Sequence, residues 1–114
     1  MNNEETLLTR KKELIDEIRD STDIFKAFSD PVRQDIFLMF MIAKRMNVAE
    51  VVEQSHLSRP AISHHLKILK QAGILSSNKV KTEVFYSLNL GDSVIAKLKR
   101  IVESAEVIMQ NKED

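Results

Sequence analysis

The sequence predicts a mostly helical fold with one small β-hairpin. Apolar residues recur at helical spacing along most of the 114 residues, and this period changes only after residue 73, where two short segments are typical of strands. The chain has only 2 glycines and 2 prolines, which argues against a loop-rich all-β fold. Its length and its hydrophobic content of 43% are those of a globular domain, so we expect a single domain over residues 1–114.

The composition excludes several kinds of protein. No cysteine is present, which removes disulfides, thiolate metal sites and thiol redox sensing. No run of 18 apolar residues occurs, and the charged N-terminal segment MNNEETLLTRKKEL has no signal-peptide core. We therefore expect a cytoplasmic protein with no membrane partner.

The first predicted helix covers residues 4–20. Its apolar residues have helical spacing but form only a narrow stripe, for which the rest of the chain offers no obvious partner. We therefore expect residues 1–22 to form a dimerisation helix whose stripe faces a second copy of the chain. The stripe residues predicted to lie in that interface are Leu7, Leu14 and Ile18.

A second helix is predicted to begin at Asp30 and Pro31, with the aspartate as N-cap and the proline at the first helical position. The segment that follows is apolar almost all round from Ile36 to Ala43, which is typical of a central core helix. A short helix is expected over residues 48–54, with its valines facing inward.

The stretch SRPAISHHLKILKQAGIL, residues 58–75, predicts an amphipathic helix that Ser58 caps and Gly73 ends. On a helical wheel, three apolar side chains form the face that must be buried. They are Ile62, Leu66 and Leu69. The opposite face has no acidic residue and carries Arg59, Ser63, Lys67 and Lys70. His64 lies at the edge of that polar face, and His65 is expected nearer the core.

Two short strands are predicted after this helix, over residues 74–80 and 83–88. The second strand, EVFYSL, is rich in β-branched and aromatic residues. Residues 78–82 are expected to form the tip of the hairpin, which carries Lys79 and Lys81.

A final helix is predicted over residues 91–110. Its apolar stripe advances in steps of about 4 and 3 residues, as in a coiled-coil seam, and nothing else in the chain is left to cover it. We therefore expect a second dimerisation helix. The seam residues are Val94, Leu98, Ile101, Ala105 and Ile108, flanked by a second line of Ile95, Val102 and Met109.

The order of these elements predicts the architecture. Two helices joined by the tight turn QSHLS, the second of them basic, followed by a basic hairpin, are typical of a winged helix-turn-helix fold. We expect this core over residues 24–90, dimerised by the N-terminal and C-terminal helices.

The distribution of charge points to a phosphate-bearing partner. The net charge is zero, with 17 basic and 17 acidic residues, yet no acid occurs between Glu53 and Glu83. All three histidines and five lysines or arginines lie in this gap. A local basic patch on a neutral chain is the footprint of a module that meets nucleic acid with one surface.

These residues resemble the ArsR/SmtB-type family of bacterial transcriptional repressors over about residues 24–90. The segment AFSDPVRQDIF is similar to the family's Asp-Pro-x-Arg helix start, and EVFYSL to its second wing strand. SRPAISHHLKILKQAGIL is similar to its recognition helix, including the Ser63–Leu66 core and the Ala-Gly-Ile exit. The resemblance implies a homodimer paired through the first and last helices, where this chain has its unexplained apolar stripes.

The departures from the family pattern concern metal binding. Metal-sensing members carry Cys-x-Cys around the short third helix, where this chain has Asn47 and Ala49. Other members place ligands on the last helix, where Asp92 remains but the next positions cannot ligate. Those positions are Val94, Ala105 and Ile108.

The predicted DNA contacts fall into two groups. Ser58, Lys67, Lys70, Lys79 and Lys81 are expected to meet phosphate, whereas Arg59, Ser63 and His64 are candidates to reach base edges in the major groove. The alternative interpretation is an ordinary solvated helix face, and the acid-free gap and the basic hairpin favour DNA over it.

Neither a metal site nor catalysis is expected. His64 and His65 are adjacent on a helix and point about 100° apart, so they chelate one ion poorly, and His56 comes from the turn. No phosphate-binding glycine loop, HExxH motif or nucleophile elbow occurs. We therefore predict that the chain is not an enzyme and needs no cofactor.

The sequence thus predicts a sequence-specific, DNA-binding transcriptional regulator. We expect a repressor that binds double-stranded DNA as a homodimer on an inverted-repeat operator. The identity of an inducer is left open by the sequence. The alternative is a winged-helix module for protein–protein contact without specific DNA binding.

Overall fold

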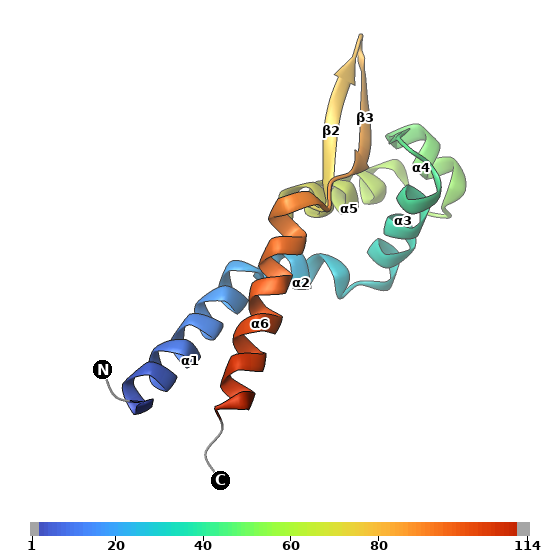
Figure 1. Ribbon diagram of the computed structural model, residues 1–114. Helices are drawn as coiled ribbons and strands as arrows, with labels where there is room; N and C mark the ends of the chain where they lie inside the picture. The colour runs from blue at the N-terminus through green and yellow to red at the C-terminus, as the bar shows by residue number, and fades with distance from the viewer. Residues whose placement is uncertain (1–2, 112–114) are drawn as a thin grey trace. The chain divides into compact units, whose positions relative to one another are not determined.

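The computed structural model describes residues 3–111, except for the side chains of Asn3 and Asp92. The helices and strands form two compact units. The terminal unit comprises the chain up to Thr22 and from Gly91 onward, and the central unit comprises Asp23–Leu90. Figure 1 shows the elements of both units along the chain.

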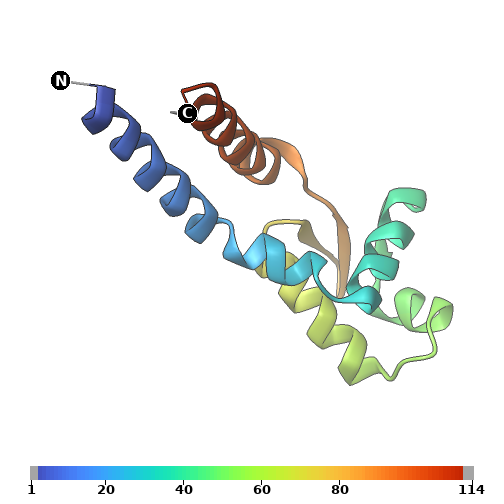
Figure 2. The same cartoon turned by 90° about the horizontal axis from the view of Figure 1, so that it is seen from below.

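Two antiparallel helices make up the terminal unit. Helix α1 (Asn3–Asp20) and helix α6 (Ala96–Gln110) run side by side in both views (Figures 1 and 2), and a π-helical turn (Gly91–Ile95) precedes α6. The Ser104 hydroxyl donates to the Glu17 carboxylate at 2.7 Å, and Lys97 Nζ lies 3.5 Å from the Asp20 carbonyl oxygen. The expectation that α6 has nothing in the chain to pack against is therefore wrong.

The packing of α1 on α6 leaves further apolar side chains in solvent. Most residues of the two predicted stripes, such as Leu14 and Ile101, are only half-buried in this helix pair. A second set of apolar side chains is exposed on the same two helices. This set comprises Leu8, Ile15 and Ile18 of α1, Ile95 of the π-helical turn before α6, and Val102 and Met109 of α6, and Ile18 also belongs to the predicted stripe.

Helix α2 (Thr22–Phe28), of which all but Thr22 belongs to the central unit, was not predicted from the sequence. The segment TDIFKAF is too short to show a full helical period, and its helix is stabilised by burial of Ile24 and Ala27. Asp30 then caps helix α3 (Pro31–Ile42) as predicted, since its Oδ1 accepts a hydrogen bond from the Val32 amide at 3.3 Å.

Helix α3 is less buried than its composition predicted. Ile36 and Phe40 belong to the core, but Leu38, Met41 and Ile42 are exposed, with Ile42 at 80%. The expectation that core residues surround α3 is therefore wrong for the side of the helix that carries Leu38, Met41 and Ile42. A unit of this size covers a helix on one face only, whatever the residue types on the other face.

Helix α4 (Val48–Gln54) begins with a capping box. The Asn47 side chain accepts from the Glu50 amide at 2.9 Å, and the Glu50 carboxylate accepts from the Asn47 amide at 2.9 Å. Of the three valines expected to face inward, Val51 is fully buried and Val48 and Val52 are half-buried. Helix α5 (Arg59–Gln71) follows after a short turn.

A three-stranded antiparallel sheet completes the central unit, with the order β1-β3-β2. Strands β2 (Leu75–Val80) and β3 (Glu83–Leu88) form the predicted hairpin, and β1 (Met46–Asn47) is a two-residue strand too short to predict. Val80 pairs with Glu83, so the connecting turn is only Lys81 and Thr82. The predicted tip of residues 78–82 is therefore too long.

Within residues 3–111 no helix has both the length and the apolar character needed to cross a bilayer.

Candidate nucleic-acid interface

Both ends of α5 are fixed by its own sequence. At the N-terminus, the Ser58 hydroxyl accepts a hydrogen bond from the Ala61 amide at 3.3 Å, which confirms the predicted cap. At the C-terminus, the Gly73 amide donates to Lys70 and the Ile74 amide to Leu69, at 2.9 and 3.0 Å. This is a Schellman motif, and it needs the left-handed backbone of Gly73, whose φ is 80°.

The two faces of α5 are those predicted from the helical wheel. Its apolar face is fully buried, and its three residues Ile62, Leu66 and Leu69 are each 0% exposed. The predicted DNA-contacting residues of the helix lie in solvent on the other side. They are Arg59, Ser63, His64, Lys67 and Lys70. Ser58 is also exposed, and its hydroxyl proton remains available to a phosphate because the capping bond uses the oxygen as acceptor.

The hairpin belongs to the same unit as α5 and follows it directly. The chain enters β2 through the Schellman turn, and the Asn89 amide donates to the Ile74 carbonyl at 2.8 Å, which closes the base of the hairpin. Lys79 and Lys81 are both exposed near its tip, as predicted. Lys81 has a left-handed backbone with a φ of 59°.

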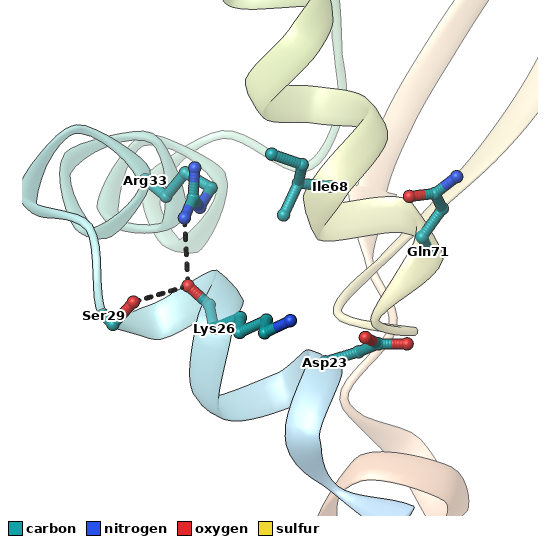
Figure 3. Close-up of a pocket in the computed structure, with 6 residues that line it drawn as sticks. All are labelled: Asp23, Lys26, Ser29, Arg33, Ile68 and Gln71. Carbon is teal, nitrogen blue, oxygen red and sulfur yellow. Dashed lines mark hydrogen bonds between the residues drawn. The ribbon is translucent and has the colours of Figure 1, made fainter.

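Sequence reasoning missed a polar cluster behind α5, which we call the Arg33 clasp. It consists of Asp30, Arg33 and His65 with the backbone carbonyl groups of Lys26 and Ala27. Arg33 Nε donates to the Ala27 carbonyl oxygen at 3.0 Å, near the end of α2. Arg33 Nη2 donates to the Lys26 carbonyl oxygen at 2.9 Å (Figure 3). Arg33 Nη1 lies 3.1 Å from Asp30 Oδ2 and 3.3 Å from His65 Nδ1. The spacing Asp-Pro-x-Arg was the available signal, because it places Asp30 and Arg33 one helical turn apart.

His65 is predominantly neutral at physiological pH. Burial lowers its pKa below the usual 6.5, the positive charge of Arg33 and the neighbouring His64 lower it further, and only Asp30 opposes them. His65 Nδ1 lies 3.5 Å from Asp30 Oδ2, but with a neutral ring this contact is not an ion pair. The neutral ring can instead accept a hydrogen bond at Nδ1 from Arg33, which has only donors.

The arrangement offers no metal centre among the described residues, where no three His, Cys, Asp or Glu side chains converge. The rings of His64 and His65 are 5.9 Å apart and inclined by 57° to each other, as expected for neighbours on a helix.

Helices α4 and α5 form a helix-turn-helix, and the hairpin of β2 and β3 follows it as a wing. With the exposed basic face of α5, this arrangement defines a winged helix-turn-helix domain. Residues 30–77 match the family model described as bacterial regulatory protein, arsR family. The transcriptional repressor SdpR of Bacillus subtilis is 41% identical over 75 residues, which are 63% of this chain and 82% of that protein. The chain belongs to the ArsR family of bacterial regulatory proteins.

Solved structures agree with this fold. An ArsR-like transcriptional regulator from Rhodococcus sp. RHA1 is similar with a TM-score of 0.61 and 26% identity, covering 81% of each chain. The homodimeric winged helix-turn-helix DNA-binding domain Mb0332 from Mycobacterium bovis has a TM-score of 0.61 at 18% identity, and the match covers 92% of this chain and 94% of that one. At that identity the second likeness supports the fold alone.

Proposed function

We propose that the chain is a transcriptional repressor that binds an inverted-repeat operator as a homodimer. The observation that carries this proposal is the exposed face of α5, where all five predicted contact residues are polar or basic and none is acidic. A helix of this kind fits the major groove of B-DNA, where hydrogen bonds to base edges provide sequence specificity. Repression follows from occlusion, since a dimer on its operator blocks access to the DNA that it covers.

The proposed contacts are of two kinds: contacts with phosphate provide affinity, and contacts with base edges provide specificity. Lys67, Lys70, Lys79, Lys81 and the Ser58 hydroxyl are proposed to meet phosphates and fix the register of the domain. Arg59, Ser63 and His64 lie on the half of α5 nearer its N-terminus, the end that usually enters the groove, and are proposed to read bases.

A second copy of the chain is the proposed cover for the exposed apolar side chains of α1 and α6. The two recognition helices of a dimer bound to an inverted repeat lie about 34 Å apart, in successive major grooves. The proposed interface keeps the predicted residues Leu7, Leu14, Ile18, Leu98, Ile101, Ala105 and Ile108, which the helix pair covers only in part. Val94 is 1% exposed in the single chain, so it is part of the core of the protomer and can only support this interface from within. Val102, Met109, Ile95, Leu8 and Ile15 are added to it, because they remain exposed in the single chain.

Replacement of Lys67 and Ser63 by alanine tests the proposed readout. Both side chains are exposed, so neither change should unfold the domain. Loss of Lys67 should weaken binding to all DNA sequences alike and reduce the salt slope by about one unit. Loss of Ser63 should cost about 1–3 kcal/mol on the cognate site and much less on scrambled DNA.

The measurement is a titration of both variants against operator and scrambled duplexes at several salt concentrations, with thermal melting as the folding control. If both variants bind the operator like the parent protein, the polar face of α5 is only a solvated surface. A winged-helix module for protein contact then becomes the better interpretation.

Zinc, arsenite and oxidants are expected not to release this chain from DNA. Arsenite and oxidants act on thiolates, and the sequence contains no cysteine. Zinc needs three or four convergent ligands, which the described residues do not supply. A gel-shift titration in which a stoichiometric amount of any of these agents abolishes binding would contradict the expectation.

A further inference from the structure

The Arg33 clasp connects three helices of the central unit. Arg33 is part of α3. Its guanidinium group donates hydrogen bonds to two backbone carbonyl oxygens in the last turn of α2 and contacts His65 on α5. The Arg33 side chain is only 13% exposed and that of His65 only 16%. The charge-assisted hydrogen bonds to α2 and to Asp30 hold this partly buried guanidinium group in one place. The position of Nη1 is therefore fixed independently of its contact with His65.

The contact with His65 is directional, whereas the rest of the buried face of α5 is not. Ile62, Leu66 and Leu69 hold the helix by apolar contact, which limits its rotation through packing but is not directional, so a hydrogen bond at His65 adds a directional constraint. His65 lies two residues after Ser63, which places the two side chains about 200° apart around the axis. A hydrogen bond on the side of His65 therefore sets the direction in which Ser63 points.

We propose that Arg33 is a positioning residue for DNA readout, which fixes the rotation of α5 by donating a hydrogen bond to Nδ1 of a neutral His65. The inference rests on the proposed function, because the role that it assigns to Arg33 is to position side chains that read DNA. Its chemistry requires the ring tautomer in which Nε2 carries the proton and Nδ1 is free to accept.

Protonation of His65 breaks this arrangement. A proton on Nδ1 removes the acceptor and brings two cations to the 3.3 Å contact, where both compete for the single Asp30 oxygen. Asp30 and Arg33 face the ring from α3, and His64 faces it from α5. From α2, backbone carbonyls complete the clasp, and the ammonium group of Lys26 points toward Asp23 (Figure 3). We therefore expect acidification to weaken operator binding through His65.

Three substitutions in the full chain separate the contact from simple packing. His65→Asn keeps an acceptor oxygen at the position of Nδ1 and cannot titrate, so it should bind the operator within about twofold of the parent. His65→Gln moves the amide one bond further out and should bind about 3- to 10-fold more weakly, which is the usual worth of one hydrogen bond. Arg33→Lys cannot make the forked contacts and should lose about tenfold. Arg100→Lys, an exposed arginine of α6, is the matched control.

The probe is a duplex selected from random DNA by the parent protein, compared with a scrambled duplex of equal length by fluorescence anisotropy between pH 5.5 and 8. The decisive quantity is the affinity of the parent divided by that of His65→Asn, because His64 and His56 are present in both proteins and His65 is the only histidine that differs. The ratio should fall several-fold as the pH drops through the pKa of His65, which burial places below the ordinary histidine value of 6.5. It should stay flat when both proteins also carry Arg33→Lys.

Correlation of the His65 ring nitrogens by ¹⁵N NMR provides a second readout that needs no DNA. The Nε2-protonated tautomer is expected in the parent, and a proton on Nδ1 at neutral pH would overturn the inference. A ratio that is flat or rises on acidification would do the same, as would parent-like operator binding by Arg33→Lys. A parent that binds selected and scrambled duplexes alike would instead overturn the proposed function, and this inference with it.

Discussion

Replacement of Val102 by glutamate is expected to make the protein monomeric at micromolar concentration and to weaken operator binding about 100-fold or more. Val102 is 54% exposed in the single chain, so a carboxylate is tolerated there by the protomer. In the proposed dimer two such carboxylates would be desolvated opposite each other, which is strongly unfavourable. Operator affinity falls with the dimer because two linked recognition helices bind far more tightly than one.

Sedimentation equilibrium measures the first effect, and titration of the operator measures the second. Arg100→Glu is the matched control, because Arg100 is exposed on a different side of α6 and its charge reversal should leave the dimer intact. Val102 is a better position for this test than Ile101, which is half-buried in the single chain, so that a charge there would also disturb the protomer. A Val102→Glu protein that remains dimeric would show that the interface lies elsewhere.

Replacement of Leu66 by alanine is expected to lower the free energy of unfolding by about 2–5 kcal/mol, the usual cost of a cavity at a fully buried leucine. Leu66 is 0% exposed and lies in the middle of α5, next to the exposed Lys67. A loss of this size is a large part of the total stability of a small domain, which is about 5–15 kcal/mol.

Chemical denaturation monitored by circular dichroism gives the free energy for Leu66→Ala and for Lys67→Ala. The two substitutions should have different effects, although they are adjacent in sequence. Leu66→Ala should lower the free energy of unfolding, whereas Lys67→Ala should mainly weaken DNA binding. Equal stability of the two variants would mean that the burial of α5 differs from that described.

The sequence was informative wherever a local signal decides the structure. Asp30 and Ser58 as N-caps, Gly73 as the helix end and the period of α5 each depend on residues within one or two turns of one another. The solvent-facing set of candidate DNA contacts on α5 followed from this period alone. The assignment of these side chains to DNA is still a proposal, since burial and spacing say where a side chain lies and not what it touches.

Apart from the length of the hairpin tip, the misses involve partners that are remote in sequence. Helix α2 and strand β1 are too short for a periodic pattern and depend on burial or pairing elsewhere, as in the pairing of Met46 with Tyr86. The stripes of α1 and α6 were assigned entirely to a second copy, although the two helices first pack on each other. Nothing in the sequence tells an intramolecular partner from an intermolecular one, because both bury the same residue types. The reach of Arg33 to His65, 32 residues away, was equally hidden.

The left-handed backbone at Lys81 has an evolutionary consequence. A residue with a Cβ atom pays about 1–2 kcal/mol in this conformation, whereas glycine adopts it freely. Selection for an unstrained turn alone would therefore favour glycine at position 81, and selection for a positive charge at the wing tip would favour lysine. Lys81 carries this conformational cost, which the proposed contact of its ammonium group with phosphate would offset. Lineages that relax the demand on DNA affinity would be expected to drift toward glycine here first.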